Sequence, residues 1–351
     1  MRLHRCPACG GPLWFGNLVC ACGAQALYDP QAGDGPGRGA FVADGVACAN
    51  RERIGCNWIA SDPSVEGAFC HACAMTDTAP DQALPEAVAQ WADAEAAKRW
   101  VLTNLARWGW WTPDDPGPLP RFDMLAEETR HGPVDVIMGH AQGRVTINLS
   151  EADPAERAKR REDLGEPYRT LIGHFRHELA HALQLRLSAL PGFLEPFREL
   201  FGDEREDYGA ALQRHYSEGP PADWSQAHVS AYASAHPHED WAESAAHLMH
   251  LTDIVDSFAA AGLRAPEGGP AHVPDVPGIE PGLDAYSQRE AEALIDRGCA
   301  LGLALNHVNR SMGLADLYPF VLAAPAREKL AFVHRWLAAG PGAPQAGQPE
   351  G

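Results

Sequence analysis

Hydrophobic residues recur at helical spacing through most of the chain after its first 85 residues. This spacing predicts helices over residues 88–109, 166–189, 203–217, 238–261, 287–305 and 326–338. Two short β-branched runs, 134–139 and 144–150, flank His-Ala-Gln-Gly and predict a hairpin. The Pro- and Gly-rich stretch 262–285 predicts a long loop, either a surface excursion or a lid.

Residues 1–75 lack such spacing and are instead rich in glycine and cysteine. The polar stretch 76–87 predicts a linker, and the Gly/Pro-rich end predicts a disordered tail over 339–351. We therefore expect an α+β protein. A small module covers 1–75, and a mostly helical domain with a small β-sheet covers 76–338.

Charge and hydropathy narrow the class of protein. The 351 residues carry a formal net charge of −19, which disfavours nucleic acid and anionic membranes as partners. No apolar run reaches the ~18 residues of a membrane span, and no secretory signal is visible. The sequence therefore predicts a soluble, cytoplasmic protein.

Eight of the nine cysteines lie within the first 73 residues. They form pairs and knuckles typical of zinc sites, and four thiolates suit the tetrahedral preference of Zn²⁺. Their order along the chain predicts two structural sites, one of Cys6, Cys9, Cys20 and Cys22 and one of Cys48, Cys56, Cys70 and Cys73. A crossed arrangement and four disulfides are the alternatives. His71 is expected not to bind metal, because its neighbours already supply four ligands. Bound metal is expected to supply the folding energy of so small a module.

The segment GHFRHELAHALQ, residues 173–184, contains an H-E-x-x-H motif. On a helix His177 and His181 share one face, so both imidazoles can reach one Zn²⁺. Glu178 can then act as general base on a water that the metal acidifies, and the resulting nucleophile attacks a carbonyl. The motif predicts a catalytic zinc. The alternative to a metal site is a surface-facing helix on which both histidines are solvated.

A third ligand is available downstream, where Glu239 and Glu243 lie four residues apart on a predicted helix. Two histidines and one carboxylate leave the fourth zinc position open for water, as catalysis requires. We prefer Glu239 as the ligand and Glu243 as its supporting acid, with the reverse left open. Asp207 and Glu204 are rival candidates for the third ligand. The alternative for these two residues is a solvated helix start that is rich in acids.

The chain resembles the bacterial family of zinc-binding metallopeptidases with an N-terminal zinc ribbon. The resemblance covers most of residues 1–338 and rests on segments that include GCNW (55–58), FCHAC (69–73), GHFRHELAH (173–181), FGDER (201–205) and YASAHPHEDWAE (232–243). It implies a zincin-like peptidase domain and a reaction class without naming a substrate.

The segment from Tyr232 to Asp253 is also similar to the catalytic segment of the gluzincins, the lethal-factor toxin protease among them. This likeness implies that Glu239 binds zinc and that Tyr232 donates its phenol to the developing oxyanion. Relatives of this kind bind an extended peptide along an edge strand. Residues 144–150 are a candidate for that strand, with an interior strand as the alternative.

These features predict a zinc metallopeptidase with one catalytic and two structural ions, acting on a peptide or protein. The competing hypothesis is a protein-binding module, in which the ribbon recognises a protein partner and the H-E-x-x-H domain is inactive. Nucleic-acid binding by residues 1–75 is disfavoured, because their arginines are balanced by acids.

Overall fold

The computed structural model describes residues 3–33, 37–153, 156, 170–268, 276–317 and 321–342. The chain divides into two compact units, Arg2–Ala182 and Leu183–Gly351, and the boundary passes through one continuous helix. Helices and small sheets coexist, so the predicted α+β class is confirmed. The expected disordered tail falls almost wholly outside the described residues.

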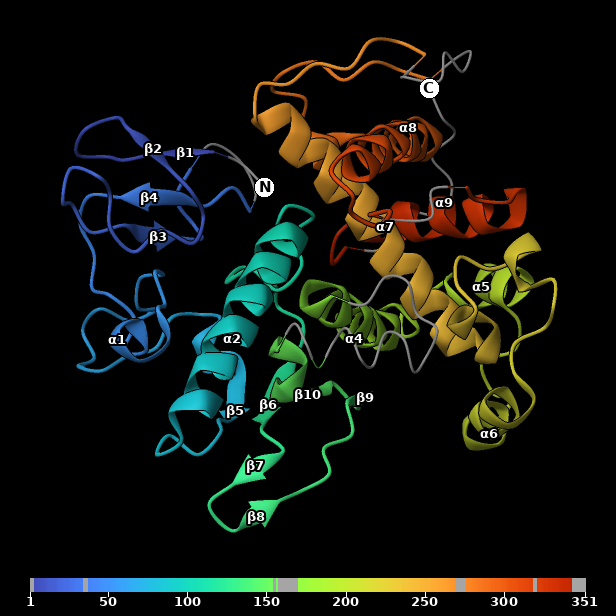
Figure 1. Cartoon of the computed structure of the whole chain (residues 1–351), viewed down its shortest axis with the longest axis horizontal. Helices are drawn as coiled ribbons and strands as arrows, with labels where there is room; N and C mark the ends of the chain where they lie inside the picture. Colours follow the sequence, from blue (N-terminus) through green and yellow to red (C-terminus); the bar gives the residue numbers. More distant parts are fainter. Residues whose placement is uncertain are drawn as a thin grey trace. The chain divides into compact units, whose positions relative to one another are not determined.

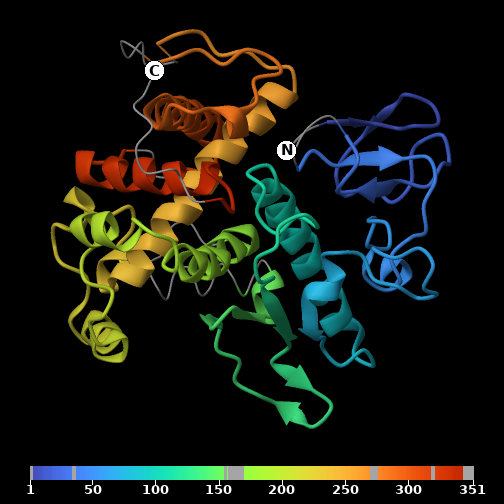
Figure 2. The same cartoon turned by 180° about the vertical axis from the view of Figure 1, so that it is seen from behind.

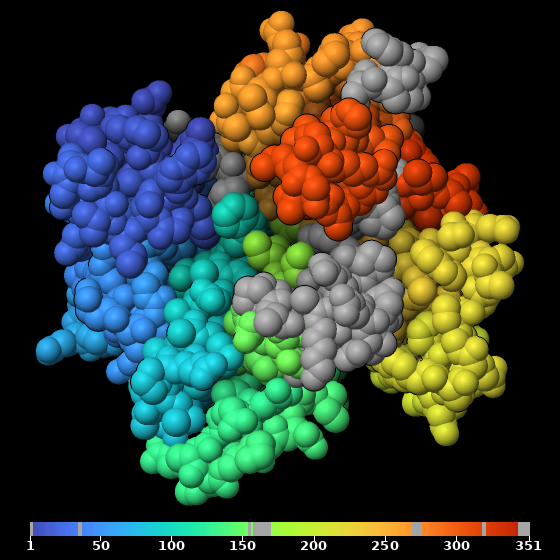
Figure 3. All heavy atoms as spheres, viewed as in Figure 1, coloured from blue at the N-terminus to red at the C-terminus, as the bar shows by residue number. Residues whose placement is uncertain are grey.

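The first unit begins with the cysteine-rich segment, built from two-stranded sheets and a one-turn helix (Figure 1). Its elements are β1 (His4–Arg5), β2 (Pro12–Leu13), β3 (Leu27–Asp29), β4 (Ala40–Val42) and α1 (Arg51–Ile54). A helix of 22 residues, α2 (Pro85–Ala106), follows, with proline at its start. Figure 3 shows the cysteine-rich residues, in blue, as a solid lobe continuous with α2, in teal.

Aromatic side chains give the cysteine-rich segment a core of its own. The buried ring of Tyr28 meets Phe15, Phe41 and Trp58 at centroid distances of 5.1, 5.6 and 5.5 Å. Gly39 has to be glycine here, because a Cβ atom would lie 2.1 Å from the Tyr28 hydroxyl. Buried aromatic surface therefore stabilises this segment in addition to any metal that it binds.

A four-stranded sheet of order β5-β6-β10-β9 completes the first unit. Its strands are β5 (Thr76–Thr78), β6 (Arg121–Leu125), β10 (Arg144–Asn148) and β9 (Gly139–Ala141). A separate hairpin joins β7 (Glu128–Thr129) to β8 (Gly132–Pro133). A hairpin into 144–150 is found as predicted, but its first strand is Gly139–Ala141 and not 134–139, so part of the predicted His-Ala-Gln-Gly turn is strand. The predicted linker over 76–87 is wrong, because β5 pairs in parallel with β6 and α2 already begins at Pro85.

Helix α4 (Leu171–Leu187) packs against the buried face of this sheet. Phe122, Met124, Val145 and Ile147 are fully buried and alternate with more exposed residues. Phe122 meets the ring of Phe175 on α4 at 6.0 Å, while Lys98 of α2 lies 4.8 Å from the Phe122 ring centroid. This face of the sheet thus fixes α4, the helix that carries the H-E-x-x-H motif.

The second unit is helical, and the predicted helices are found with shifted ends. Its helices are α5 (Leu194–Phe201), α6 (Tyr208–Glu218), α7 (Pro237–Ala260), α8 (Ala291–Ser311) and α9 (Ala324–Ala338). The predicted helix over 203–217 begins later than expected, because Asp207 caps α6 and residues 202–207 form the loop after α5. Part of the predicted 262–285 loop lies outside the described residues, and an Ala265–Ile279 bridge closes its base.

Helix α7 is the axis of this unit, with α8 and α9 packed along it, as Figures 1 and 2 show from opposite sides. At Gly298 a Cβ atom would lie 2.9 Å from the Leu251 side chain, so glycine allows α8 to approach α7 closely. Aromatic rings of α5, of the residue that precedes it, and of α7 and α9 pack together near the start of α7, namely Phe193, Phe197, Phe201, Trp241, Phe332 and Trp336. No helix in the described ranges is long and apolar enough to cross a membrane.

Candidate metal centres

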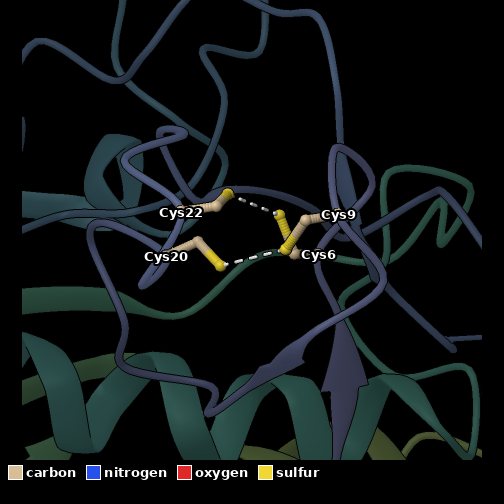
Figure 4. A group of neighbouring side chains, drawn as sticks. All are labelled: Cys6, Cys9, Cys20 and Cys22. Atoms are coloured by element: carbon tan, nitrogen blue, oxygen red, sulfur yellow. Dashed lines mark hydrogen bonds between the residues drawn. The ribbon is translucent and has the colours of Figure 1, made fainter.

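Four cysteines from two turns converge in the first candidate centre (Figure 4). The sulfur of Cys6 lies 3.9 Å from that of Cys22, and the sulfur of Cys9 lies 3.7 Å from that of Cys20. Four ligands at ~2.3 Å around a tetrahedral Zn²⁺ are separated by about 3.8 Å.

The second centre is formed by Cys48, Cys56, Cys70 and Cys73, all buried. Cys56 Sγ lies 3.6 Å from Cys70 Sγ and 3.8 Å from Cys73 Sγ, so the zinc spacing recurs. These are the two groups that the order of the cysteines suggested. Disulfides are excluded here, because a bonded pair is ~2.05 Å apart and all nine cysteines are free.

Two further residues belong to this second centre's surroundings. His71 Nε2 lies 2.7 Å from the Trp111 carbonyl oxygen, so its ring tethers the knuckle to the chain beyond α2. Arg99 of α2 is buried. Burial lowers the pKa of its guanidinium, but the neighbouring charges of Cys56, Glu95 and Cys73 outweigh this effect, so the pKa is raised. A buried guanidinium that interacts with these sulfurs offsets the negative charge of a thiolate quartet. No local sequence pattern points to Arg99, because it lies on another element, α2.

Helix α4 carries the histidine pair of the motif. The Nε2 atoms of His177 and His181 lie 3.2 Å apart, one helical turn apart in sequence. Two nitrogens at ~2.05 Å from a tetrahedral Zn²⁺ are separated by about 3.3 Å, so the pair fits one ion. Glu178 is buried next to the first histidine, with 8% of its surface exposed.

Strand β9 supplies a residue that no sequence motif indicates. The ring of His140 stacks on that of His181, with centroids 6.0 Å apart and planes inclined by 16°. Its Nε2 accepts a hydrogen bond from the Gly143 amide, and burial, followed by the charge of His181, lowers its pKa to about 4. His140 therefore stays neutral and packs against a candidate ligand.

The first turn of α7 carries Glu239. Pro237 occupies the first helical position and His236 caps the helix by accepting the His238 amide, so the chain turns into a helix just before Glu239. Glu239 is 1% exposed, and its Oε1 accepts a hydrogen bond of 2.6 Å from the hydroxyl of Tyr208. A helix start also favours the ionised carboxylate.

Glu239 and the two histidines form a third group of potential ligands, whose ligand atoms all lie within 4.8 Å of one another. Gln184 connects α4 with α7 independently of these ligands. It follows His181 by about one turn on α4, and its Oε1 lies 2.9 Å from Nδ1 of His238 on α7. Glu243 accepts a 2.6 Å hydrogen bond from Ser230 and lies 3.9 Å from His247 Nε2.

The rival acids have other partners. Glu204 pairs with Arg198, whose guanidinium lowers the pKa of Glu204, and Asp207 caps α6 by accepting the Ala210 amide at 2.9 Å. The helix-start interpretation therefore holds for Asp207, whereas Glu204 lies in the loop between α5 and α6. The strand that was a candidate for substrate binding, 144–150, is interior, because β10 pairs with both β6 and β9. The alternative is thus confirmed, and among the described strands β9 forms the sheet edge.

Comparison with known proteins agrees with this chemistry. Three mycobacterial proteins, among them the uncharacterized proteins Mb2598c of Mycobacterium bovis and Rv2568c of Mycobacterium tuberculosis, are 38% identical over 343 residues, covering 95% of this chain and 94% of theirs. No solved structure matches. A family model described as "Putative zinc-binding metallo-peptidase" matches residues 87–336, which include the histidine pair and Glu239. The chain therefore belongs to this zinc-binding metallopeptidase family.

Proposed function

We propose that the chain is a zinc-dependent peptidase of gluzincin type, in which His177, His181 and Glu239 hold the catalytic ion. The observation that carries the proposal is the 3.2 Å separation of the two Nε2 atoms, which matches the spacing of zinc ligands. Two neutral nitrogens and one carboxylate are the donor set of catalytic zinc in peptidases, and they leave one position open.

Zinc bound there supplies a Lewis acid and lowers the pKa of a coordinated water. Glu178 adjoins the ligand pair and is almost fully buried, so its carboxylate can accept the proton of the attacking water. The same carboxyl group then returns the proton to the departing amine. Removal of the carboxylate should therefore abolish the reaction without loss of the ligands.

Tyr232, at the start of the 3-10 turn Tyr232–Ala235, is the proposed oxyanion donor. Burial, and after it the charge of Glu239, raises the pKa of Tyr232 well above its usual value. The phenol thus keeps its proton at neutral pH and can donate it in a hydrogen bond. Its ring meets that of His215 edge-on at 5.8 Å, which restrains its orientation.

The substrate is proposed to lie along β9. This strand is an edge among the described strands, and its residue His140 packs on the ligand His181. An extended peptide that pairs with β9 would satisfy the strand's open backbone groups and bring its own carbonyls near the histidine pair. Main-chain pairing of this kind selects extended peptides with little regard to sequence.

The test uses the full chain and a library of unstructured peptides. Glu178→Gln should keep the zinc content of the wild type and lose hydrolysis, whereas Glu239→Ala should lose one zinc per chain. Undiminished hydrolysis by the Glu178→Gln protein would refute the proposed mechanism. We expect three zinc ions per chain, one catalytic and two in the cysteine quartets.

A protein-binding module with an inactive peptidase domain is the second candidate function. The observation that favours it is exposed apolar surface on the cysteine-rich segment, where Trp14 is 64% and Val19 54% exposed. This hypothesis expects two zinc ions, both lost when the cysteines are replaced. Exposed apolar residues beside the first quartet also fit a protein partner of an active enzyme.

A further inference from the structure

We infer that Tyr208 is a positioning residue for Glu239, holding one carboxylate oxygen so that the other alone faces the ion. The inference rests on the proposed function, because it takes Glu239 to be the third metal ligand. Its basis is the 2.6 Å hydrogen bond from the Tyr208 hydroxyl to Glu239 Oε1. A bond this short from a neutral donor to a carboxylate is of the strong, charge-assisted kind.

The start of α6 fixes the backbone of Tyr208. Asp207 has extended backbone angles and accepts the Ala210 amide at 2.9 Å, so Tyr208 is the first residue of the helix. Glu206, one residue earlier, places its carbonyl oxygen 3.2 Å from His236 Nε2. His236 is the residue that caps α7 immediately before Glu239, so the two helix starts are tied together.

The ring of Tyr208 is held by the same histidines. It meets the ring of His236 edge-on at 5.2 Å and that of His238 at 6.4 Å. His238 is held in turn by Gln184 of α4 at 2.9 Å. The Tyr208 phenol and the Glu239 carboxylate thus lie at the starts of two helices that are tied together. A supporting residue held in this way can orient a metal ligand.

The number of carboxylate oxygens that face the ion determines the coordination number. With Oε1 engaged by the phenol, Glu239 offers a single oxygen, and two histidines and one oxygen leave a fourth position open. Without the phenol both oxygens can bind, which adds a fifth ligand and crowds the position that water needs. Loss of the supporting bond also leaves the carboxylate less well oriented. Such losses typically weaken metal affinity ~10–100-fold.

The experiment compares Tyr208→Phe with the wild type in the full chain. Zinc retention is measured against increasing chelator, and the first ion lost, which Glu239→Ala removes, reports the site. We expect Tyr208→Phe to weaken its retention at least ~10-fold. After cobalt replacement the visible absorption should decrease, as it does when a four-coordinate site gains a ligand. Arg214→Ala, at an exposed position on the same helix, is the matched control and should change neither value.

The outcomes separate this inference from the proposed function. If Tyr208→Phe retains zinc and absorbs like the wild type while Glu239→Ala loses the ion, Tyr208 has no positioning role and the zinc site stands. If Glu239→Ala keeps all its zinc, the proposed function fails as well. Should Tyr208→Phe not fold by circular dichroism, Asp207→Ala, which loosens the start of α6, gives the second test. Unchanged zinc retention in folded Asp207→Ala would then overturn the inference.

Discussion

Lys329 Nζ on α9 lies 2.6 Å from Asp240 Oδ2 on α7, and both side chains are buried, with 6% and 1% exposed. The ammonium also donates to the Ala227 carbonyl at 2.9 Å, and His228 Nδ1 lies 3.1 Å from the same carboxylate oxygen. Asp240 follows Glu239 directly in the first turn of α7. The ion pair therefore ties the backbone of the candidate metal ligand to α9.

Replacement of Lys329 by methionine should destabilise the protein strongly. The change leaves the Asp240 carboxylate buried without its cation, and breaking such a pair costs about 3–5 kcal/mol. Urea unfolding measures the loss. The exposed pair Arg264–Glu280 provides the control, since Arg264→Ala should cost less than about 1 kcal/mol. The double variant Lys329→Met/Asp240→Leu should be more stable than Lys329→Met, and equal stability of the two would contradict the argument.

The stability of the protein should fall as pH drops below about 6.5, in part through His334 of α9. Burial lowers the pKa of this histidine below its ordinary value of ~6.5. The unfolded chain therefore binds the proton more readily, and the free energy of unfolding falls as the pH falls through this range. The His334→Gln variant lacks this contribution to the pH dependence of the free energy of unfolding. The difference in unfolding free energy between wild type and variant should shrink between pH 7.5 and 5.5, and a constant difference would exclude His334 as a source.

Arg99→Leu should weaken zinc binding by the second cysteine quartet. The variant removes the buried cation whose pKa the charges of Cys56, Cys73 and Cys70 raise, so a thiolate quartet loses part of its compensation. We expect retention of this ion against a chelator to weaken ~10-fold, as for other supporting residues. Arg53→Ala, at an exposed position on α1, is the control. Identical zinc release from the wild type and Arg99→Leu would show that the guanidinium has no such role.

Tyr232→Phe should reduce peptide hydrolysis with little effect on zinc content. Removal of a single oxyanion donor typically lowers kcat ~10²–10³-fold, because the bond forms only in the transition state. KM should change little for the same reason. Steady-state kinetics on one cleaved peptide measures both constants. A variant with raised KM and unchanged kcat would assign Tyr232 to substrate binding instead.

Local sequence patterns predicted the helices well. Periodic hydrophobic residues identified α7 within one residue at either end, and the H-E-x-x-H motif was correctly expected on a helix. The start of α6 was missed because the acidic residues before Tyr208 read as a helical first turn, whereas Asp207 acts as its cap. Strand β5 was missed because Thr76–Thr78 is three residues long and polar, and only pairing with β6 makes it a strand.

The sequence by itself determined the candidate ligands that lie close along the chain. Residues four apart on a helix share a face, and cysteines two or three apart share a turn, so His177 and His181 and the cysteine knuckles follow from spacing alone. The tertiary structure decided the contacts made across the fold. Tyr208 meets Glu239 across 31 residues and Arg99 lies beside the second quartet, because helix packing sets those distances and no local pattern encodes them.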